Sequence, residues 1–156
     1  MPLSVAKDFI DLLLKNDINT RQYIDTRACD AIVIDFIGGE PLLEVELIDQ
    51  IMEYFIKRTI EEDHPWQYNW RMSISSNGTL YFEPKVQNFI KKWFNYLSFN
   101  ISIDGNKELH DSCRVFPDGS GSYDKAIKAV HHYIDELGGT MGSKMTLAPE
   151  NIQYTF

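Results

Sequence analysis

Two short segments of the sequence combine residue types that bind small polar ligands. In Gly38-Gly39-Glu40-Pro41, two consecutive glycines let the backbone turn sharply and bring its carbonyls and amides close to a ligand. Glu40 adds a carboxylate, which is suited to an ammonium group. Ser102 and Asp104 alternate along the chain, which places both side chains on one face of a strand, able to bind hydroxyl groups or a ribose. The alternative without a ligand is that Gly38 and Gly39 only form a turn and that Glu40 is a surface residue.

Other segments carry weaker chemical signals. Asn77-Gly78-Thr79 is a further candidate, although it also has the composition of an ordinary turn. The glycine-rich stretch 118–125 lacks the Gly-Lys-Ser/Thr ending of a phosphate-binding P-loop. His110 and Cys113 have the types of a base and a nucleophile, but no neighbouring residue in the sequence orients them. We therefore predict neither a catalytic residue nor a metal site in this chain.

The elements that must position these segments alternate between strand and helix. Residues 31–37 form a short, β-branched, nearly continuous apolar run, which predicts a parallel strand covered on both faces. Further strands are predicted over 67–76, 97–103 and 144–147, the last closed by Ala148-Pro149. Apolar residues at helical spacing predict helices over 4–15, 43–61, 83–96 and 122–137. Residues 106–121 are predicted to form a long polar loop.

This order of elements predicts an α/β fold. Strands separated by helices of this length require parallel pairing with right-handed crossovers. A closed barrel needs about eight strands, so the chain forms either a small open sheet or an arc of a barrel. We favour a partial (β/α) barrel arc of about four parallel strands with helices outside, as one domain over 1–156, because a new helix begins near Pro149. Ligands bind beyond the carboxyl ends of such strands, where the candidate segments lie.

Composition excludes several classes of function. The 156 residues are 44% hydrophobic and 24% charged, which is typical of a folded domain and not of a disordered chain. Fifteen basic against 23 acidic residues leave a net charge of −8, which argues against nucleic acid as a partner. No apolar stretch approaches the roughly 20 residues that cross a bilayer, so we expect no membrane partner. Two cysteines fit a reducing, cytoplasmic location.

Taken together, the motifs resemble those of the radical S-adenosylmethionine (radical SAM) superfamily. Gly-Gly-Glu-Pro follows one strand, and Ser-x-Asp-Gly follows the strand two later. The stretches 102–123 and 144–151 are similar to the branch that contains anaerobic sulfatase-maturating enzymes and peptide maturases with a SPASM-type C-terminal extension. The resemblance covers almost the whole chain. It implies an oxidoreductase that cleaves S-adenosylmethionine to a 5′-deoxyadenosyl radical and modifies a side chain of a peptide or protein partner.

The resemblance also implies which residues bind S-adenosylmethionine. These are Gly38, Gly39, Glu40, Ser102, Asp104 and Arg114, with Asn77 as a further candidate. In the family, the Gly-Gly-Glu segment holds the amino group of the ligand, and the arginine pairs with its carboxylate. Such an arrangement is chemically coherent, since a zwitterionic amino acid needs acceptors for its ammonium group and a fork of donors for its carboxylate.

The sequence departs from the family in one large respect. The family's Cys-x3-Cys-x2-Cys motif, which binds a 4Fe–4S cluster, is absent. Cys29 and Cys113 are too few and misplaced to replace its three thiolates. We therefore expect the chain to be the middle of a longer enzyme, in which the cluster ligands lie upstream, and to be inactive in the radical reaction by itself.

Two other interpretations remain open at the level of the sequence. The chain could be a cluster-less, degenerate domain that binds S-adenosylmethionine or a peptide. It could also be a small α/β domain whose glycines only make turns; the ordered motifs place this interpretation last. A partial barrel leaves two sheet edges unpaired, so we also expect edge-to-edge self-association.

Overall fold

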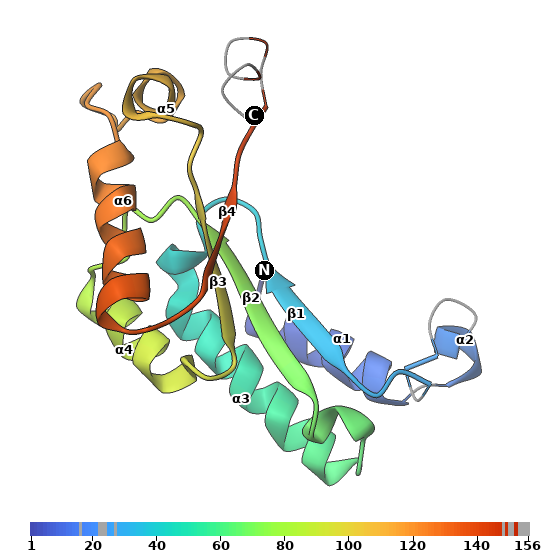
Figure 1. Cartoon of the computed structure of the whole chain (residues 1–156). Coiled ribbons are helices and arrows are strands. Elements are labelled where there is room, and N and C mark those ends of the chain that lie inside the picture. Colours follow the sequence, from blue (N-terminus) through green and yellow to red (C-terminus); the bar gives the residue numbers. More distant parts are fainter. Residues whose placement is uncertain (16, 22–24, 27, 148, 150–151, 153–156) are drawn as a thin grey trace. The chain divides into compact units, whose positions relative to one another are not determined.

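Helices and strands alternate along the chain (Figure 1). The structure is a computed structural model and describes residues 1–15, 17–21, 25–26, 28–147, 149 and 152. The helices are α1 (Leu3–Lys15), α2 (Ile18–Arg21), α3 (Val45–Glu61), α4 (Pro84–Trp93), α5 (Lys107–Cys113) and α6 (Tyr123–His131). The strands are β1 (Ile32–Phe36), β2 (Trp70–Ser76), β3 (Leu97–Ser102) and β4 (Met141–Lys144). Shorter turns are η1 (Pro41–Glu44), η2 (Pro65–Gln67) and the π-helical η3 (His132–Glu136).

The strands form one sheet in the order β1-β2-β3-β4. β2 pairs with β3 in parallel, with Ile74 opposite Phe99, and β3 pairs with β4 in parallel, with Phe99 opposite Met141. Strands that follow one another in both the sequence and the sheet, joined by helices, are the arrangement of βαβ units. The predicted α/β class with four parallel strands is therefore confirmed. None of the described helices has both the length and the apolar character needed to cross a membrane.

The chain divides into two compact units, each built from two segments. Residues 1–34 and 44–71 form unit 1, and residues 35–43 and 72–156 form unit 2. In unit 1, α1 packs on α3. Arg58 binds the carboxylate of Asp11 at 2.8 Å and so ties these two helices together. Unit 2 contains β3, β4 and all of the residues that the sequence assigns to ligand binding.

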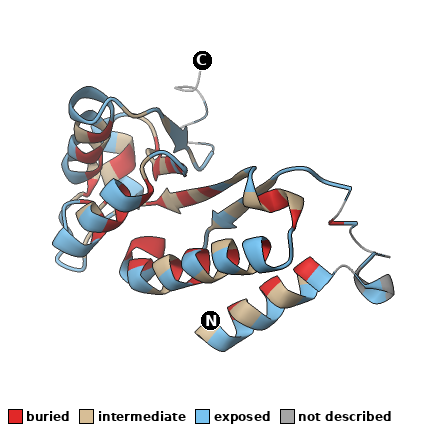
Figure 2. Ribbon diagram, turned by 90° about the horizontal axis from the view of Figure 1, so that it is seen from below, coloured by how far each residue is buried: buried red, intermediate tan, exposed pale blue. Residues whose placement is uncertain are grey.

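The core of unit 2 follows from the alternation of side chains along the strands. Met72, Ile74, Phe99 and Ile101 are fully buried, each on every second position of β2 or β3. The helices cover this face with apolar stripes, which Figure 2 shows as red segments between pale blue ones. The buried residues of α4 and α6 are Val86, Phe89, Ile90, Trp93, Ala126 and Ala129. The rings of Tyr81 and Tyr133 pack against the ring of Phe99, with 5.8 and 5.6 Å between the ring centroids.

The other face of the same strands is polar. Asn100 lies at its centre, and its side-chain amide donates to the carbonyl of Ile74 at 3.3 Å. On β4, Gly142 is the register partner of Asn100. A Cβ atom at position 142 would lie only 2.2 Å from Oδ1 of Asn100, so the glycine makes room for that amide.

Two predicted elements differ from the observed ones, and one further predicted segment lies outside the described residues. The segment 106–121, predicted to be a loop, contains the helix α5, because Asn106 caps its first turn by accepting the Leu109 N–H at 3.0 Å. The last strand, predicted over 144–147, lies at Met141–Lys144, where Gly142 suits the crowded pairing with β3. Ala148, Glu150 and Asn151, which belong to the turn expected after this strand, lie outside the described residues.

The first two strands also correct the sequence analysis. β1 alternates between half-buried and exposed residues, and Val33 is 62% exposed, so the strand is not covered on both faces among the described residues. Its β-branched residues suit a pleated, half-buried surface and do not require burial on both faces. β2 begins at Trp70 and not at residue 67, because Pro65 starts the turn η2 there.

Candidate functional site

The loop after β1 turns through two glycines in the left-handed region of backbone conformation. Gly38 has φ +96° and Gly39 has φ +51°, and no atom lies within 4 Å of a Cβ built at either position. The glycines are therefore required by the backbone conformation and not by lack of space. Both residues are exposed, as expected for a segment whose peptide groups are free to meet a ligand.

Glu40 connects this loop to the carboxyl end of β2. Its Oε1 accepts hydrogen bonds from the Ser76 hydroxyl at 2.8 Å and from the Leu42 N–H at 3.0 Å. Its Oε2 accepts from the Asn77 N–H at 2.9 Å. An ionised carboxylate has about four acceptor positions, so these three bonds leave one, on Oε2, for an ammonium group. Glu40 thus shapes the loop and keeps an acceptor for a ligand.

The Glu40 bonds lead to a prediction for stability. Glu40→Gln replaces one acceptor oxygen by an NH2 group, which faces a donor in either orientation of the amide. We expect a loss of about 1–2 kcal/mol in the free energy of unfolding, measured by urea denaturation. Glu108→Gln changes an exposed glutamate of the same unit and should cost less than about 0.5 kcal/mol. Equal stability of the two variants would contradict this role of Glu40.

Asn77 directs its side chain into its own turn. Its Oδ1 accepts the Thr79 N–H at 2.8 Å and the Thr79 hydroxyl at 2.7 Å. This bonding is typical of an Asx turn, which the composition of the segment indicated. Asn77 therefore contributes its backbone N–H to Glu40, while its side-chain oxygen stabilises the loop after β2.

Asp104 and Arg114 form a largely buried ion pair after β3. Nε of Arg114 donates to Oδ2 of Asp104 at 2.5 Å, and the Thr146 N–H donates to Oδ1 at 2.7 Å. The Asp104 side chain is 5% exposed and the Arg114 side chain 27%. Burial alone would raise the pKa of Asp104, but the hydrogen bonds from Arg114 and from the Thr146 amide outweigh it and lower that pKa. The carboxylate is thus held in its ionised form.

The ion pair with Asp104 occupies Nε of Arg114, which the sequence analysis expected to bind the carboxylate of the ligand. Its Nη2 lies 3.5 Å from the Thr146 hydroxyl, and no bond to Nη1 is found among the described residues. Nη1 is the group of Arg114 that remains for a ligand carboxylate. Ser102 lies opposite Lys144 in the register of β3 and β4, and its hydroxyl has no hydrogen-bond partner among the described residues. Ser102 and Nη1 therefore keep donors that a ligand can use.

Three residues of this region, His110, Ser122 and Thr146, were not among the predicted ligand-binding residues. His110 is completely buried and accepts the Asp104 N–H on Nδ1 at 3.2 Å, while its Nε2 lies 3.1 Å from the Ser122 hydroxyl. Ser122 in turn donates to the carbonyl of Arg114 at 2.9 Å. The signal that could have revealed this was Asn106 as a helix N-cap, because a helix from 107 directs His110 inward.

The predicted site residues therefore fall into two groups within unit 2. The first joins Gly38, Gly39 and Glu40 to Ser76 and Asn77 through the bonds of Glu40. The second, which we call the Asp104 network, consists of Asp104, His110, Arg114, Ser122 and Thr146. Both groups follow carboxyl ends of strands in a parallel sheet, which is the ligand-binding end of such folds.

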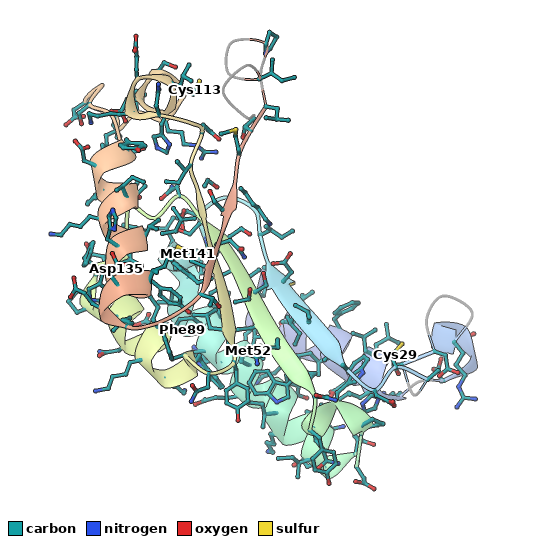
Figure 3. The ribbon with its side chains drawn as sticks, in the orientation of Figure 1. Cys29, Met52, Phe89, Cys113, Asp135 and Met141 are labelled. Carbon is teal, nitrogen blue, oxygen red and sulfur yellow. The ribbon has the colours of Figure 1, made fainter. Side chains whose placement is uncertain are left out.

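An iron–sulfur cluster does not fit the residues of this chain. No group of three or more histidine, cysteine, aspartate or glutamate side chains in the described ranges could hold a metal ion. Cys29 and Cys113, labelled in Figure 3, are both exposed; the first belongs to unit 1 and the second ends α5 in unit 2. Since a 4Fe–4S cluster requires several cysteine thiolates, we derive no step through such a cluster.

The known proteins that this chain resembles are longer than the chain itself. No family model matches it. It is 32% identical over 131 residues to Uncharacterized protein MJ0907 of Methanocaldococcus jannaschii, a match that covers 84% of this chain and 38% of that protein. The chain thus spans well under half of the length of this relative.

Solved structures share the fold. "Native anSMEcpe with bound AdoMet" superposes with a TM-score of 0.67 at 21% identity, over 92% of this chain and 34% of that one. The same enzyme with AdoMet and the Kp18Cys peptide gives a TM-score of 0.68 with the same identity and coverage. This enzyme is of the anaerobic sulfatase-maturating, radical SAM kind that the sequence resembles. The chain therefore has the fold of an arc of a radical SAM barrel, about a third of the solved enzyme.

Proposed function

We propose that the chain is part of a radical SAM enzyme and binds S-adenosylmethionine at the carboxyl ends of β1, β2 and β3. The observation that carries this proposal is the placement of Glu40 and the Asp104 network after these strands, in a fold shared with AdoMet-bound enzymes. Their side chains match the two charged ends of the amino-acid part of the ligand. Glu40 offers an acceptor to the ammonium group, and Arg114 offers donors to the carboxylate.

The residues of the chain would bind and orient the ligand. The exposed peptide groups of Gly38 and Gly39 provide carbonyl acceptors beside Glu40 for the ammonium group. The Ser102 hydroxyl and Nη1 of Arg114 supply donors to the carboxylate, and Asp104 keeps the guanidinium group in place. In a complete enzyme, one electron from a reductant held outside this chain would break the C5′–S bond of S-adenosylmethionine, releasing methionine and a 5′-deoxyadenosyl radical that would abstract a hydrogen atom from a substrate. We infer that this substrate is a peptide or protein side chain, since the matched enzyme was solved with peptides bound.

Ligand binding by the chain provides the first test. We expect S-adenosylmethionine to bind with a Kd of about 1 mM or weaker, measured by saturation-transfer NMR, because the two cysteines of the chain are too few to hold the cluster whose iron would chelate the amino and carboxylate groups. Arg114→Ala and Glu40→Gln should each weaken this binding further. 5′-Methylthioadenosine lacks the amino-acid part of the ligand, so both variants should bind it as the wild type does.

The controls separate a local site from general damage. Arg71→Ala removes an exposed arginine near the start of β2, at the opposite end of the strand, and should leave the Kd unchanged. Micromolar or tighter binding that is insensitive to Arg114→Ala would overturn the assignment of the site. Equal losses for S-adenosylmethionine and 5′-methylthioadenosine would show that Arg114 does not contact the carboxylate.

A binding module without its own cluster is the second candidate function. The observation that favours it is that no group of three metal-ligating side chains occurs in the parts of the chain that the structure describes. Reading the coding sequence upstream of Met1 in the same frame distinguishes the two candidates. An upstream Cys-x3-Cys-x2-Cys would support the enzyme, and an in-frame stop just before Met1 would support the module. We place either form in the cytoplasm, and expect copies of the chain to associate through the edges of the sheet.

A further inference from the structure

His110 lies between the two partners of the buried ion pair. Its ring is completely buried and meets the ring of Tyr123 edge-on, with 5.5 Å between the centroids. One ring nitrogen contacts the backbone of Asp104, and the other contacts Ser122, which binds the backbone carbonyl of Arg114. The imidazole therefore connects the turn after β3 with the segment after α5, the same two segments that the Asp104–Arg114 ion pair joins.

The hydrogen-bond partners determine the protonation state of this ring. The N–H of Asp104 can only donate, so Nδ1 of His110 must accept and carries no proton. The Ser122 hydroxyl has a single hydrogen, which it donates to the Arg114 carbonyl, so it accepts from Nε2 of His110. The chain of bonds is complete only for a neutral imidazole that is protonated at Nε2.

We propose that His110 is a positioning residue, which holds the backbones of Asp104 and Arg114 at the separation that their side chains need to pair. A proton on Nδ1 would set two donors against each other at the Asp104 amide and so release the turn that carries the carboxylate. The ion pair would then depend on the protonation state of a histidine that does not itself touch either charged group through its ring nitrogens.

The charged and titratable groups around His110 lie on α5, next to it and on α6. Asp104 precedes α5, Lys107 and Asp111 lie on α5 itself, Arg114 follows its last residue, and Tyr123 of α6 meets the imidazole ring. Burial, first of all, and then the charge of Arg114 lower the pKa of His110, whereas Asp104 and Asp111 oppose this change. The net direction is downward from 6.5, so His110 is neutral at pH 7, in agreement with its hydrogen bonds.

NMR spectroscopy of the 156-residue chain tests the proposal directly. The nitrogen shifts of His110 should show the Nε2–H tautomer at pH 7. The Nε–H of Arg114, identified by its loss in Arg114→Lys, should be protected from exchange with solvent. In the wild type, this protection should fall about tenfold or more as the pH drops through the pKa of His110, after correction for intrinsic exchange.

Two substitutions at position 110 separate positioning from packing. His110→Asn keeps an acceptor near the place of Nδ1 but does not titrate, so the Arg114 Nε–H should stay protected until Asp104 itself titrates, below 3.8. His110→Phe keeps the ring but not the acceptor, and should lose the protection about tenfold at pH 7. His131→Asn, at an exposed histidine of α6, should behave as the wild type does.

Several outcomes would overturn the proposal. They are an Nδ1–H tautomer at pH 7, protection of the Arg114 Nε–H that does not follow the titration of His110, or full protection in His110→Phe. The first two need no variant at position 110, so they hold even where His110→Phe does not fold.

The value of this positioning for a ligand rests on the proposed function. If the chain binds S-adenosylmethionine as proposed, His110→Phe should weaken this binding, whereas His110→Asn should retain most of the affinity of the wild type. If the wild type binds no S-adenosylmethionine while the exchange data come out as expected, the proposed function fails and the positioning role of His110 stands.

Discussion

Replacing Asp104 with asparagine is expected to lower the free energy of unfolding by about 2–3 kcal/mol, because it leaves the guanidinium group of Arg114 without its carboxylate. The Oδ1 of the asparagine can still accept the Thr146 N–H. Its NH2 group, however, faces the Nε–H of Arg114, donor against donor. Urea denaturation at pH 7 measures the change.

Asp135→Asn provides the matched control. Asp135, labelled in Figure 3, is 62% exposed at its side chain and pairs with His131 on the same helical segment. Exposed pairs of this kind contribute little, so the variant should differ from the wild type by less than about 0.5 kcal/mol. If Asp104→Asn were as stable as Asp135→Asn, the buried pair would not stabilise the fold.

The pH dependence of Asp104→Asn has a definite sign. The pKa of Asp104 is lower in the folded state than its ordinary value of 3.8. Its ionised form therefore stabilises the fold above that value, and this contribution disappears as the pH falls through the lower, folded pKa. The difference in stability between the wild type and Asp104→Asn should be constant above about pH 6.5, where His110 is neutral, and should be lost once the pH falls below the folded pKa of Asp104.

Phe99→Ala is expected to produce the other large loss, about 3–5 kcal/mol, because it empties the centre of the core of unit 2. Phe99 is fully buried on β3, with the rings of Tyr81 and Tyr133 on it. Tyr81 cannot move into the space, since its hydroxyl is held by His132 at 2.8 Å. The measurement is again the midpoint and slope of urea denaturation.

Two comparisons qualify the result for Phe99. Phe99→Leu retains most of the apolar volume and should cost less than about 1.5 kcal/mol. Phe9→Ala removes a phenylalanine that is 58% exposed on α1, and should change stability by less than about 0.5 kcal/mol. A similar loss for Phe9→Ala and Phe99→Ala would contradict the assignment of Phe99 to the core.

The sequence predicted the order of the main elements because their periodicities reflect burial on one face. α3 and α4 keep apolar residues at helical spacing, and β3 alternates strictly from Leu97 to Ile101. Where the pattern was short or mixed, the prediction was wrong. α5 has few apolar residues and depends on its cap at Asn106, and β4 contains Gly142, which has no side chain to show a pattern.

The candidate site was predictable in its segments but not in its bonds. The positions of Glu40 and Asp104 follow from the ends of their strands, which the sequence indicates. That Asp104 would pair with Arg114, predicted to bind a ligand carboxylate, depends on how a helix of seven residues turns back after β3. The same turn buries His110, which the sequence analysis placed in a loop with no neighbouring residue to orient it. These relations between residues become visible only in three dimensions.

The close approach of Asn100 to β4 constrains the order in which the sequence can change over evolution. A side chain introduced first at Gly142 would collide with the Asn100 amide, whose Nδ2 is already bonded to β2. If Asn100 is first replaced by serine or alanine, the space opens and many residues become acceptable at position 142. The two positions are therefore epistatic. In related sequences, we expect a residue larger than glycine at this point of β4 to accompany a shorter one at the partner position of β3.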